Sequence, residues 1–412
     1  MTITPISTEG STRTAPPAKR PRDMRLDFFR GLAMYIIFIA HVPNDSWNDW
    51  IPARFGFSSG SELFVFCSGV ASALAFGSIY VTRGWLLGTA RILYRIWQVY
   101  WAHVSLFIAS IALAALADHM VSGGGFVREQ FAYFLERPAD AILAALTLRW
   151  LPPYIDILPL YVVILAGIPL MMAARLAHPV LPMALSVGLY TAVWVFGINL
   201  PGDPSSPGAG WFFNPFAWQL VFYSGFAFCS GWLPMPRLGN SRLMLLCVAV
   251  LAISLPIAFW GIRMFIPALE QFYAMILPEN EKSDIHILRY LHFLALTYVA
   301  LSLIDPFKDR LNAGLGHIII MVGQQSLAAF LGSLMMARVA GIILETLDHS
   351  ALTVAAINIG GFIGITAIAA SVRWVKSSPW ARVARPLPVA PVGERERAIG
   401  AANETPPKRL LA

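Results

Sequence analysis

The sequence predicts an all-α polytopic membrane protein with about ten transmembrane helices, and three observations support this. Of the 412 residues, 57% are hydrophobic and 13% are charged, whereas about 25% of the residues of soluble proteins are charged. The apolar residues gather in runs near the roughly 20 residues that a membrane-spanning helix needs. Polar connections separate these runs, and their basic residues favour one side of the membrane.

Ten apolar segments follow one another along the chain. The first, at about 27–42, is short because Pro43 disfavours helix at the residue before it. Residues 141–150 would form a re-entrant or interfacial helix, with eleven spans as the alternative count. The other nine segments are 61–81, 96–117, 155–174, 180–198, 215–233, 243–266, 286–304, 318–340 and 351–372.

The basic residues between these segments predict the orientation. Eight Lys and Arg residues lie in the connections on one side of this layout, against four on the other side, where the connections are longer. The positive-inside rule then places both termini in the cytoplasm and requires an even number of spans. The eight are Arg83, Arg91, Arg95, Arg175, Arg237, Arg242, Lys308 and Arg310.

Both ends of the chain are expected to be disordered cytoplasmic tails, at 1–24 and 376–412, around a membrane domain at 25–375. The first hydrophobic run begins only at Phe28, so we expect a retained span and no cleavable signal peptide. The three cysteines lie in apolar stretches without a CxxC pair and are expected to be reduced.

Several functional classes lack support. The net charge of +7 is expected to mark cytoplasmic loops and the phospholipid face, and nucleic acid is not an expected partner. The chain has no Gly-rich phosphate loop, no GxSxG and no HExxH, which excludes P-loop ATPases, serine hydrolases and zinc proteases. No metal site is expected.

The first span carries an acid, a base and a histidine on one helical stripe. At about 100° per residue, Arg30 and His41 return to within ~20° of each other, and Asp27 lies ~40° to the other side. His41 lies roughly 16 Å along the axis from Arg30. An ionisable group within a span is a functional candidate because it costs at least ~2.5 to 3.5 kcal/mol unless paired or hydrated.

Near the inner face, Asp27 and Arg30 form an i,i+3 pair, with Arg83, Arg91 and Arg95 within reach. These arginines are either a topology signal alone or a clamp for an anionic donor that carries phosphate.

Toward the outer face, five polar groups share one depth and suggest a single cavity. A histidine there needs a partner to set its tautomer, and either of two carboxylates could serve. Packing is the favoured interpretation for His292, and His103 could line the same channel from below. The five groups are His41, Glu62, Asp156, Arg289 and His292.

Aromatic residues accompany the outer carboxylates. Trp47, Trp50, Trp150 and Tyr154 are either anchors at the membrane interface or stacking platforms for a sugar. An open cavity with these groups fits a polyhydroxylated acceptor.

Four motifs of this sequence resemble the OpgC family, within the acyltransferase-3-like superfamily of membrane acyltransferases. Residues 25–31 read Arg-Leu-Asp-Phe-Phe-Arg-Gly and precede His41. The resemblance continues through Ser-Gly-Ser-Glu-Leu-Phe-Val-Phe-Cys-Ser-Gly at 59–69, Leu-Pro-Pro-Tyr-Ile-Asp-Ile-Leu-Pro-Leu-Tyr at 151–161 and Ile-Leu-Arg-Tyr-Leu-His at 287–292. It covers about 24–375.

The resemblance implies an acyltransferase-3-like bundle in the bacterial inner membrane. Such an enzyme would transfer succinyl groups from cytoplasmic succinyl-CoA to osmoregulated periplasmic glucans, with acyl-CoA as donor substrate and no permanently bound cofactor. The expected catalytic residues are His41, Glu62 and Asp156. The donor would meet Asp27, Arg30, Arg83, Arg91 and His103, and the acceptor would meet Trp47, Trp150, Tyr154, Arg289 and His292.

Three hypotheses remain open from the sequence. In an acyltransferase, His41 would act as general base, with an acyl-histidine relay as a variant. In a transporter or exporter, the buried charges would bind substrate or relay protons, although no inverted repeat is visible. In a sensor or scaffold, Asp27, Arg30 and His41 would be polar groups used for packing.

Overall fold

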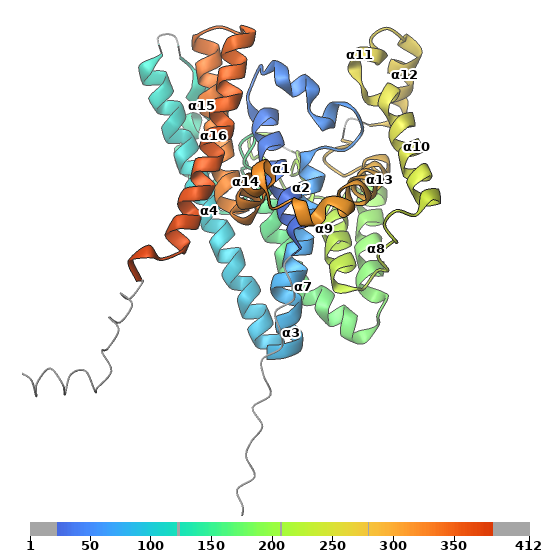
Figure 1. The fold of residues 1–412 in the computed structure, drawn as a ribbon. Coiled ribbons are helices and arrows are strands. Elements are labelled where there is room, and N and C mark those ends of the chain that lie inside the picture. The colour runs from blue at the N-terminus through green and yellow to red at the C-terminus, as the bar shows by residue number, and fades with distance from the viewer. Residues whose placement is uncertain (1–22, 122–123, 207, 279, 382–412) are drawn as a thin grey trace, which may run out of the picture. The chain divides into compact units, whose positions relative to one another are not determined.

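The computed structural model describes residues 23–121, 124–206, 208–278 and 280–381 (Figure 1). Within these ranges the regular structure is helical, apart from one isolated bridge between Pro201 and Gly210. This confirms the all-α prediction. The predicted tails lie largely outside the described residues.

Sixteen α-helices are present in the described part of the chain, with a few short 3₁₀ turns and one π-helical turn, at Ala73–Gly77, between them. Their bounds are α1 Met24–His41, α2 Gly60–Ser72, α3 Ser78–Arg83, α4 Trp85–Met120, α5 Phe126–Glu136, α6 Pro138–Leu146, α7 Ile157–Ala177, α8 Leu181–Phe196, α9 Pro215–Ser230, α10 Ser241–Ala258, α11 Trp260–Arg263, α12 Pro267–Ile276, α13 Ile287–Ile304, α14 Gly314–Gln324, α15 Ser326–Thr346 and α16 Ala351–Lys376.

Seven helical segments in the described residues are long and apolar enough to cross a membrane. They correspond to seven of the predicted spans. The other three predicted spans are α1, α8 and α9. Helix α1 carries Arg25, Asp27 and Arg30 within its 18 residues, and α8 and α9 each have 16 residues. The seven are 60–83, 85–120, 157–177, 241–258, 287–310, 326–346 and 351–381.

The structure corrects the predicted boundaries in four places. The ninth segment is two helices, because Gln325 interrupts it with φ −107° and ψ 29°. The third is one helix of 36 residues that includes Arg91 and Arg95, since arginine is a good helix former. The connection after the third predicted segment carries α5 and the first three residues of α6, and the seventh segment ends at Ala258.

Glycines allow two pairs of helices to pack backbone against backbone. A Cβ on Gly31 of α1 would lie 1.9 Å from the carbonyl oxygen of Ile319 on α14, and one on Gly323 of α14 would lie 1.8 Å from that of Asp27. On α2 and α9, Gly69 and Gly225 approach the partner backbone as closely. Small residues at such crossings allow helices to pack without an intervening side chain.

Helix α9 lies at the centre of the helices that frame the site. Twelve of its sixteen residues are buried, and Trp218, Phe222 and Phe226 are among the largest fully enclosed side chains. A helix buried on all sides needs no polar face, which explains why its apolar residues show no one-sided pattern.

The contacts divide the chain into two units at Ala370 and Ser371. The first contains the helical bundle. In the second, the described residues are the end of α16 and a 3₁₀ turn at Pro379–Ala381, where the rings of Trp374 and Trp380 lie 6.0 Å apart.

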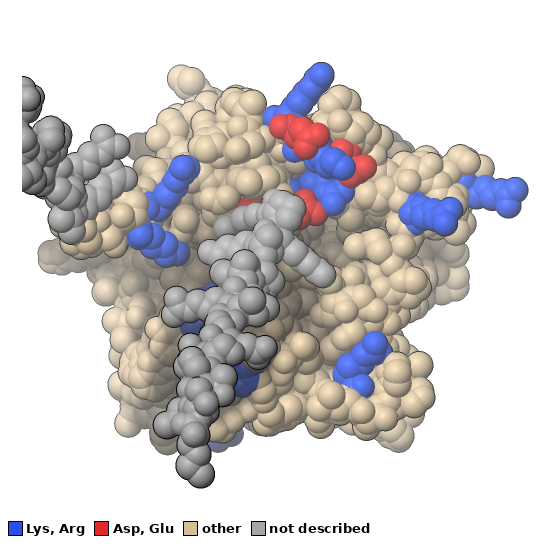
Figure 2. Space-filling view, turned by 60° about the horizontal axis from the view of Figure 1, so that its bottom comes forward, with Lys and Arg blue, Asp and Glu red and all other residues tan. Residues whose placement is uncertain are grey.

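Figure 2 shows the side of the molecule on which α3 ends in Figure 1; Lys and Arg side chains are spread over it, and the visible Asp and Glu side chains gather in one area beside Lys and Arg.

Candidate functional site

Two cavities lie along α1, one near each end. The larger, about 730 Å³, is lined by His41 at the last residue of α1, and we call it the His41 cavity. The smaller, about 250 Å³, is lined by Arg30 and is called the Arg30 cavity. The structure therefore places these two predicted residues in separate cavities, with a helical rise of roughly 16 Å between them.

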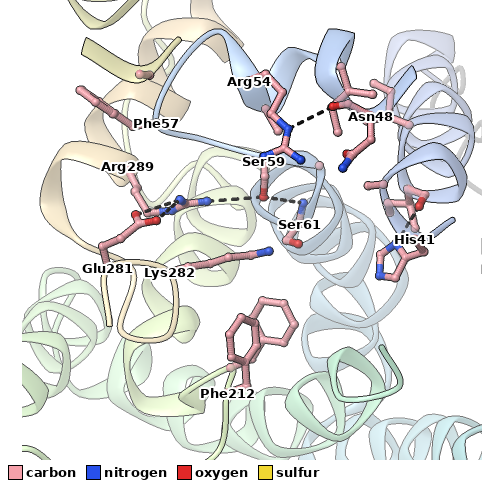
Figure 3. A pocket seen from close by; sticks show the side chains of 18 of the residues that line it. His41, Asn48, Arg54, Phe57, Ser59, Ser61, Phe212, Glu281, Lys282 and Arg289 are labelled. Carbon is pink, nitrogen blue, oxygen red and sulfur yellow. Dashed lines mark hydrogen bonds and ion pairs between the residues drawn. The ribbon is translucent and has the colours of Figure 1, made fainter. Parts of the chain in front are cut away.

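The ring of His41 is oriented by the backbone of its own helix. Its Nδ1 lies 2.6 Å from the carbonyl oxygen of Ile37 (Figure 3). A carbonyl oxygen only accepts hydrogen bonds, so Nδ1 donates and Nε2 keeps a lone pair. The ring of Tyr154 meets the imidazole edge-on, with 5.2 Å between the centroids. The hydrogen-bond partner of Nδ1 is therefore a backbone carbonyl. The sequence had suggested a carboxylate in this role, from Glu62 or Asp156.

The segment before α7 brings Tyr154 and Asp156 to the His41 cavity. Tyr154 has φ +71°, so the chain turns sharply there, and its side chain is 49% exposed. Arg338 of α15 donates to the carbonyl of Pro153 at 3.0 Å and holds this turn. Asp156 occupies the N-cap position of α7.

Glu62 and Arg289 form a buried ion pair at the edge of the same cavity. Nε and Nη2 of Arg289 donate to Glu62 at 2.9 and 2.7 Å, and Nη1 donates to Glu281 at 2.8 Å. The other oxygen of Glu62 accepts from the backbone and hydroxyl of Ser59. One oxygen of Glu62 therefore joins α2 to α13, and the other caps the start of α2.

Lys282 reaches into the His41 cavity from the loop before α13 (Figure 3). Its ammonium lies 5.6 and 5.8 Å from the ring centroids of Phe212 and Phe213. The indole of Trp218 donates to the carbonyl of Lys282 at 3.0 Å and anchors the loop. Burial lowers the pKa of Lys282, and the nearby charge of Arg289 lowers this pKa further.

Lys282 is one of the four basic residues, with Arg54, Arg128 and Arg137, that the predicted layout places in the outer connections, and the sequence predicts no role for it. One feature of the sequence could have identified Lys282 as a site residue: it is a single lysine in an acidic loop, directly before a span that carries Arg289.

Seven predicted site residues line neither of the two cavities: Glu62, described above, and Asp27, Arg83, Trp47, Trp150, His292 and His103. Trp47 packs on Phe362, and Trp150 lies in an aromatic cluster with Phe107, Phe131 and Tyr133. His292 hydrogen-bonds Ser58 at 2.8 Å, and its ring covers Gly56. His103 is buried beside the backbone of Ile155, but neither ring nitrogen has a hydrogen bond among the described residues.

The Arg30 cavity gathers three arginines. Arg91 and Arg95 of α4 line it together with Arg30, which donates a hydrogen bond to the hydroxyl of Ser326. Arg83 is exposed at the end of α3 and does not line it. Asp27 is buried against α14 and accepts from Gln324 at 3.5 Å.

The linings of the two cavities come close together on two elements. At the start of α7, the N-cap residue Asp156 lines the His41 cavity and Leu158 lines the Arg30 cavity. On α2, Ser61 lines the His41 cavity and Phe64 lines the Arg30 cavity. Residues two or three apart on a helix differ by about 3 to 4.5 Å in rise, less than one turn. The arrangement thus places His41 in one cavity and three arginines in the other, with linings that adjoin on α2 and at the start of α7.

Comparison with known proteins gives one match. A family model described as OpgC protein matches residues 22–377, which include both cavities. Neither the curated proteins nor the solved structures contain a match. Because the match spans most of the 412 residues, the chain belongs to the OpgC family.

Proposed function

We propose that this protein is an integral-membrane O-acyltransferase that moves a succinyl group from cytoplasmic acyl-CoA to hydroxyls of a periplasmic glucan. Membership of the OpgC family supports an acyltransferase that modifies a glucan. The observation that carries the proposal is the pair of cavities, with Nε2 of His41 in one and three arginines in the other.

The donor binds through the Arg30 cavity. Arg30, Arg91 and Arg95 supply guanidinium groups that match the geometry of phosphate oxygens. At 250 Å³ the cavity is smaller than the roughly 300 to 1,000 Å³ of pockets that enclose drug-sized ligands. It therefore takes the narrow pantetheine arm, while the phosphates and the nucleotide remain at its mouth.

The reaction takes place at His41. Nε2 accepts the proton of a glucan hydroxyl as the hydroxyl oxygen adds to the thioester carbonyl. The tetrahedral intermediate collapses, the carbon–sulfur bond breaks, and the imidazolium returns its proton to the departing thiolate. The hydrogen bond from Nδ1 to Ile37 keeps the ring in the required tautomer throughout.

The acceptor occupies the His41 cavity. Tyr154, Phe212 and Trp260 give this cavity aromatic faces, and Asp156 and Asp203 give it carboxylates. Sugar rings offer apolar faces for stacking and hydroxyls that donate to carboxylates. With about 730 Å³, the cavity accommodates one segment of a glucan chain at a time.

The test replaces His41→Ala in the full-length protein, reconstituted with succinyl-CoA and a purified osmoregulated periplasmic glucan. Coenzyme A release and the mass of the glucan are measured together. We expect a loss of about 10² to 10⁴-fold in transfer. His349→Ala, an exposed loop histidine, serves as control. Undiminished succinylation by the His41 variant in a correctly inserted protein would overturn the proposal.

An exporter is the second candidate, and one observation favours it. Helices α14 and α15 are interrupted at Gln325, and the first residue of α15 contacts Arg30. Interrupted helices whose ends face a charged site are a feature of transporters. If the protein exports glucan, vesicles containing it would accumulate labelled glucan without acyl-CoA, and His41→Ala would leave both this flux and the glucan mass unchanged.

A further inference from the structure

The His41 cavity has an uneven charge balance. Four Lys and Arg residues line it. Arg289 is compensated by Glu62 and Glu281, and Arg263 pairs with Glu270 at 2.6 Å. Arg54 is exposed to solvent and donates to a backbone carbonyl at 3.1 Å. Within the described residues, the remaining one, Lys282, forms no ion pair, so its charge is available to a ligand.

Lys282 shares its cavity with His41 and Asp156. Its side chain extends over Phe212 into the cavity toward the side where His41 lies (Figure 3). The charge of Lys282 acts on both His41 and Asp156. A half-buried ammonium beside aromatic rings interacts more strongly with an anion than an exposed one does, because less water screens it.

We propose that Lys282 is the counter-ion of a carboxylate on the transferred acyl group, so that the site selects a short dicarboxylic acyl donor over a neutral one. This inference rests on the proposed function. The anion belongs to the acyl group because Lys282 and His41 face the same cavity, and in the proposed reaction the acyl carbon lies at His41. A neutral acyl group would leave the ammonium in the cavity without a partner, which costs free energy.

Three carboxylates of the chain act on Lys282, and because Glu62 and Glu281 pair with Arg289, Asp156 is the alternative partner. Asp156 feels the charge of Lys282, although the two form no ion pair in the structure. If Lys282 served only to neutralise Asp156, its removal would affect all donors alike, and removal of Asp156 would reverse the effect. The two roles therefore differ in their dependence on the donor.

The experiment compares succinyl-CoA with butyryl-CoA, whose acyl chains have the same number of carbons. The full-length protein in lipid nanodiscs is given a purified osmoregulated periplasmic glucan, and kcat/KM is measured for each donor. Lys282→Gln should lower kcat/KM for succinyl-CoA by about 10- to 100-fold and leave the butyryl-CoA value unchanged or raised. Lys282→Arg should retain the preference, and Lys308→Gln, at an exposed lysine, is the control.

The outcomes separate the two proposals. One outcome is that Lys282→Gln lowers kcat/KM equally for both donors and that adding Asp156→Asn restores both values. This would show that Lys282 serves to neutralise Asp156, and it would overturn the inference. Unchanged succinyl-CoA preference in Lys282→Gln would also overturn it, while leaving acyl transfer intact. If the unaltered protein transfers neither acyl group, the proposed function fails and the inference fails with it.

Discussion

Three histidines with similar sequence surroundings have different environments. His41 donates to its own helix backbone and presents Nε2 to a cavity. His292 hydrogen-bonds the hydroxyl of Ser58 and fills the space over Gly56. His103 is enclosed within the bundle. Of the three, the geometry suits His41 for proton transfer to a ligand.

Charge removal in the Arg30 cavity should weaken donor binding. We expect Arg91→Gln and Arg95→Gln each to raise KM for succinyl-CoA by about 5- to 10-fold, because each removes a charge-assisted hydrogen bond to phosphate. Steady-state kinetics with kcat measured separately would check this. Arg83→Gln should behave as the unaltered protein, since Arg83 lies outside the cavity. An equal effect of Arg83→Gln would contradict the placement of the phosphates.

The buried pair of Glu62 and Arg289 should contribute to stability. Glu62→Gln removes the charge opposite Arg289, and breaking a buried pair from one side costs about 3 to 5 kcal/mol. We expect a lower thermal midpoint for the detergent-solubilised protein. Glu270→Gln is the matched control, because Glu270 is 57% exposed in its pair with Arg263 and exposed pairs contribute little. Equal midpoints for the two variants would argue against a stabilising role of the buried pair.

At the scale of elements, the helix crossings depend on glycine. Helices α1 and α14 approach at Gly31 and Gly323, and α2 and α9 approach at Gly69 and Gly225. The first crossing holds the stripe of α1 that carries Asp27 against α14. The second holds α2 against the buried helix α9. These contacts position one wall of each cavity.

A methyl group at one of these glycines should destabilise the bundle. In Gly225→Ala, the new Cβ would lie 2.3 Å from the carbonyl oxygen of Phe66, which is backbone and cannot rotate away. We expect a loss of about 1 to 3 kcal/mol or more, seen as a reduced yield of monodisperse protein and a lower thermal midpoint. Gly188→Ala meets no atom within 4 Å and should be neutral. A fully stable Gly225→Ala protein would show that the crossing can widen without cost.

At the scale of the whole bundle, the helix ends sort into two groups. The end of α1 and the starts of α2, α7, α9 and α13 meet around the His41 cavity. The face in Figure 2, over which Lys and Arg side chains are spread, lies on the side on which α3 ends in Figure 1. We propose, from the positive-inside rule, that this basic face is cytoplasmic and that the His41 cavity opens to the periplasm.

Cysteine labelling would test this orientation. After Cys67, Cys229 and Cys247 are replaced by Ala, a single cysteine is introduced at Trp50 or at Lys308. Trp50 follows α1 and is 71% exposed, and Lys308 lies in the turn after α13. A membrane-impermeant maleimide should label Trp50→Cys in intact spheroplasts and Lys308→Cys only after permeabilisation. The reverse pattern would invert the proposed orientation.

The sequence alone determined the helical class, the apolar runs and the separation of Arg30 from His41. These properties depend on local composition and on the regular rise of one helix. The same local information predicted one helix across Gln325, where the chain breaks. The residues on either side of this break, Gln324 and Ser326, hydrogen-bond Asp27 and Arg30, which lie about 300 residues away in the sequence.

Tertiary structure alone decided which polar residues share a cavity. The order of spans gives each side chain a depth, but the direction in which it points depends on how each helix is rotated against its neighbours. His292 and Trp150 have the expected depth and face packed protein, whereas Lys282 faces His41 across the cavity. Glu62 meets Arg289 only because α2 and α13 come together in the bundle, and that contact depends on side-chain packing across the whole chain.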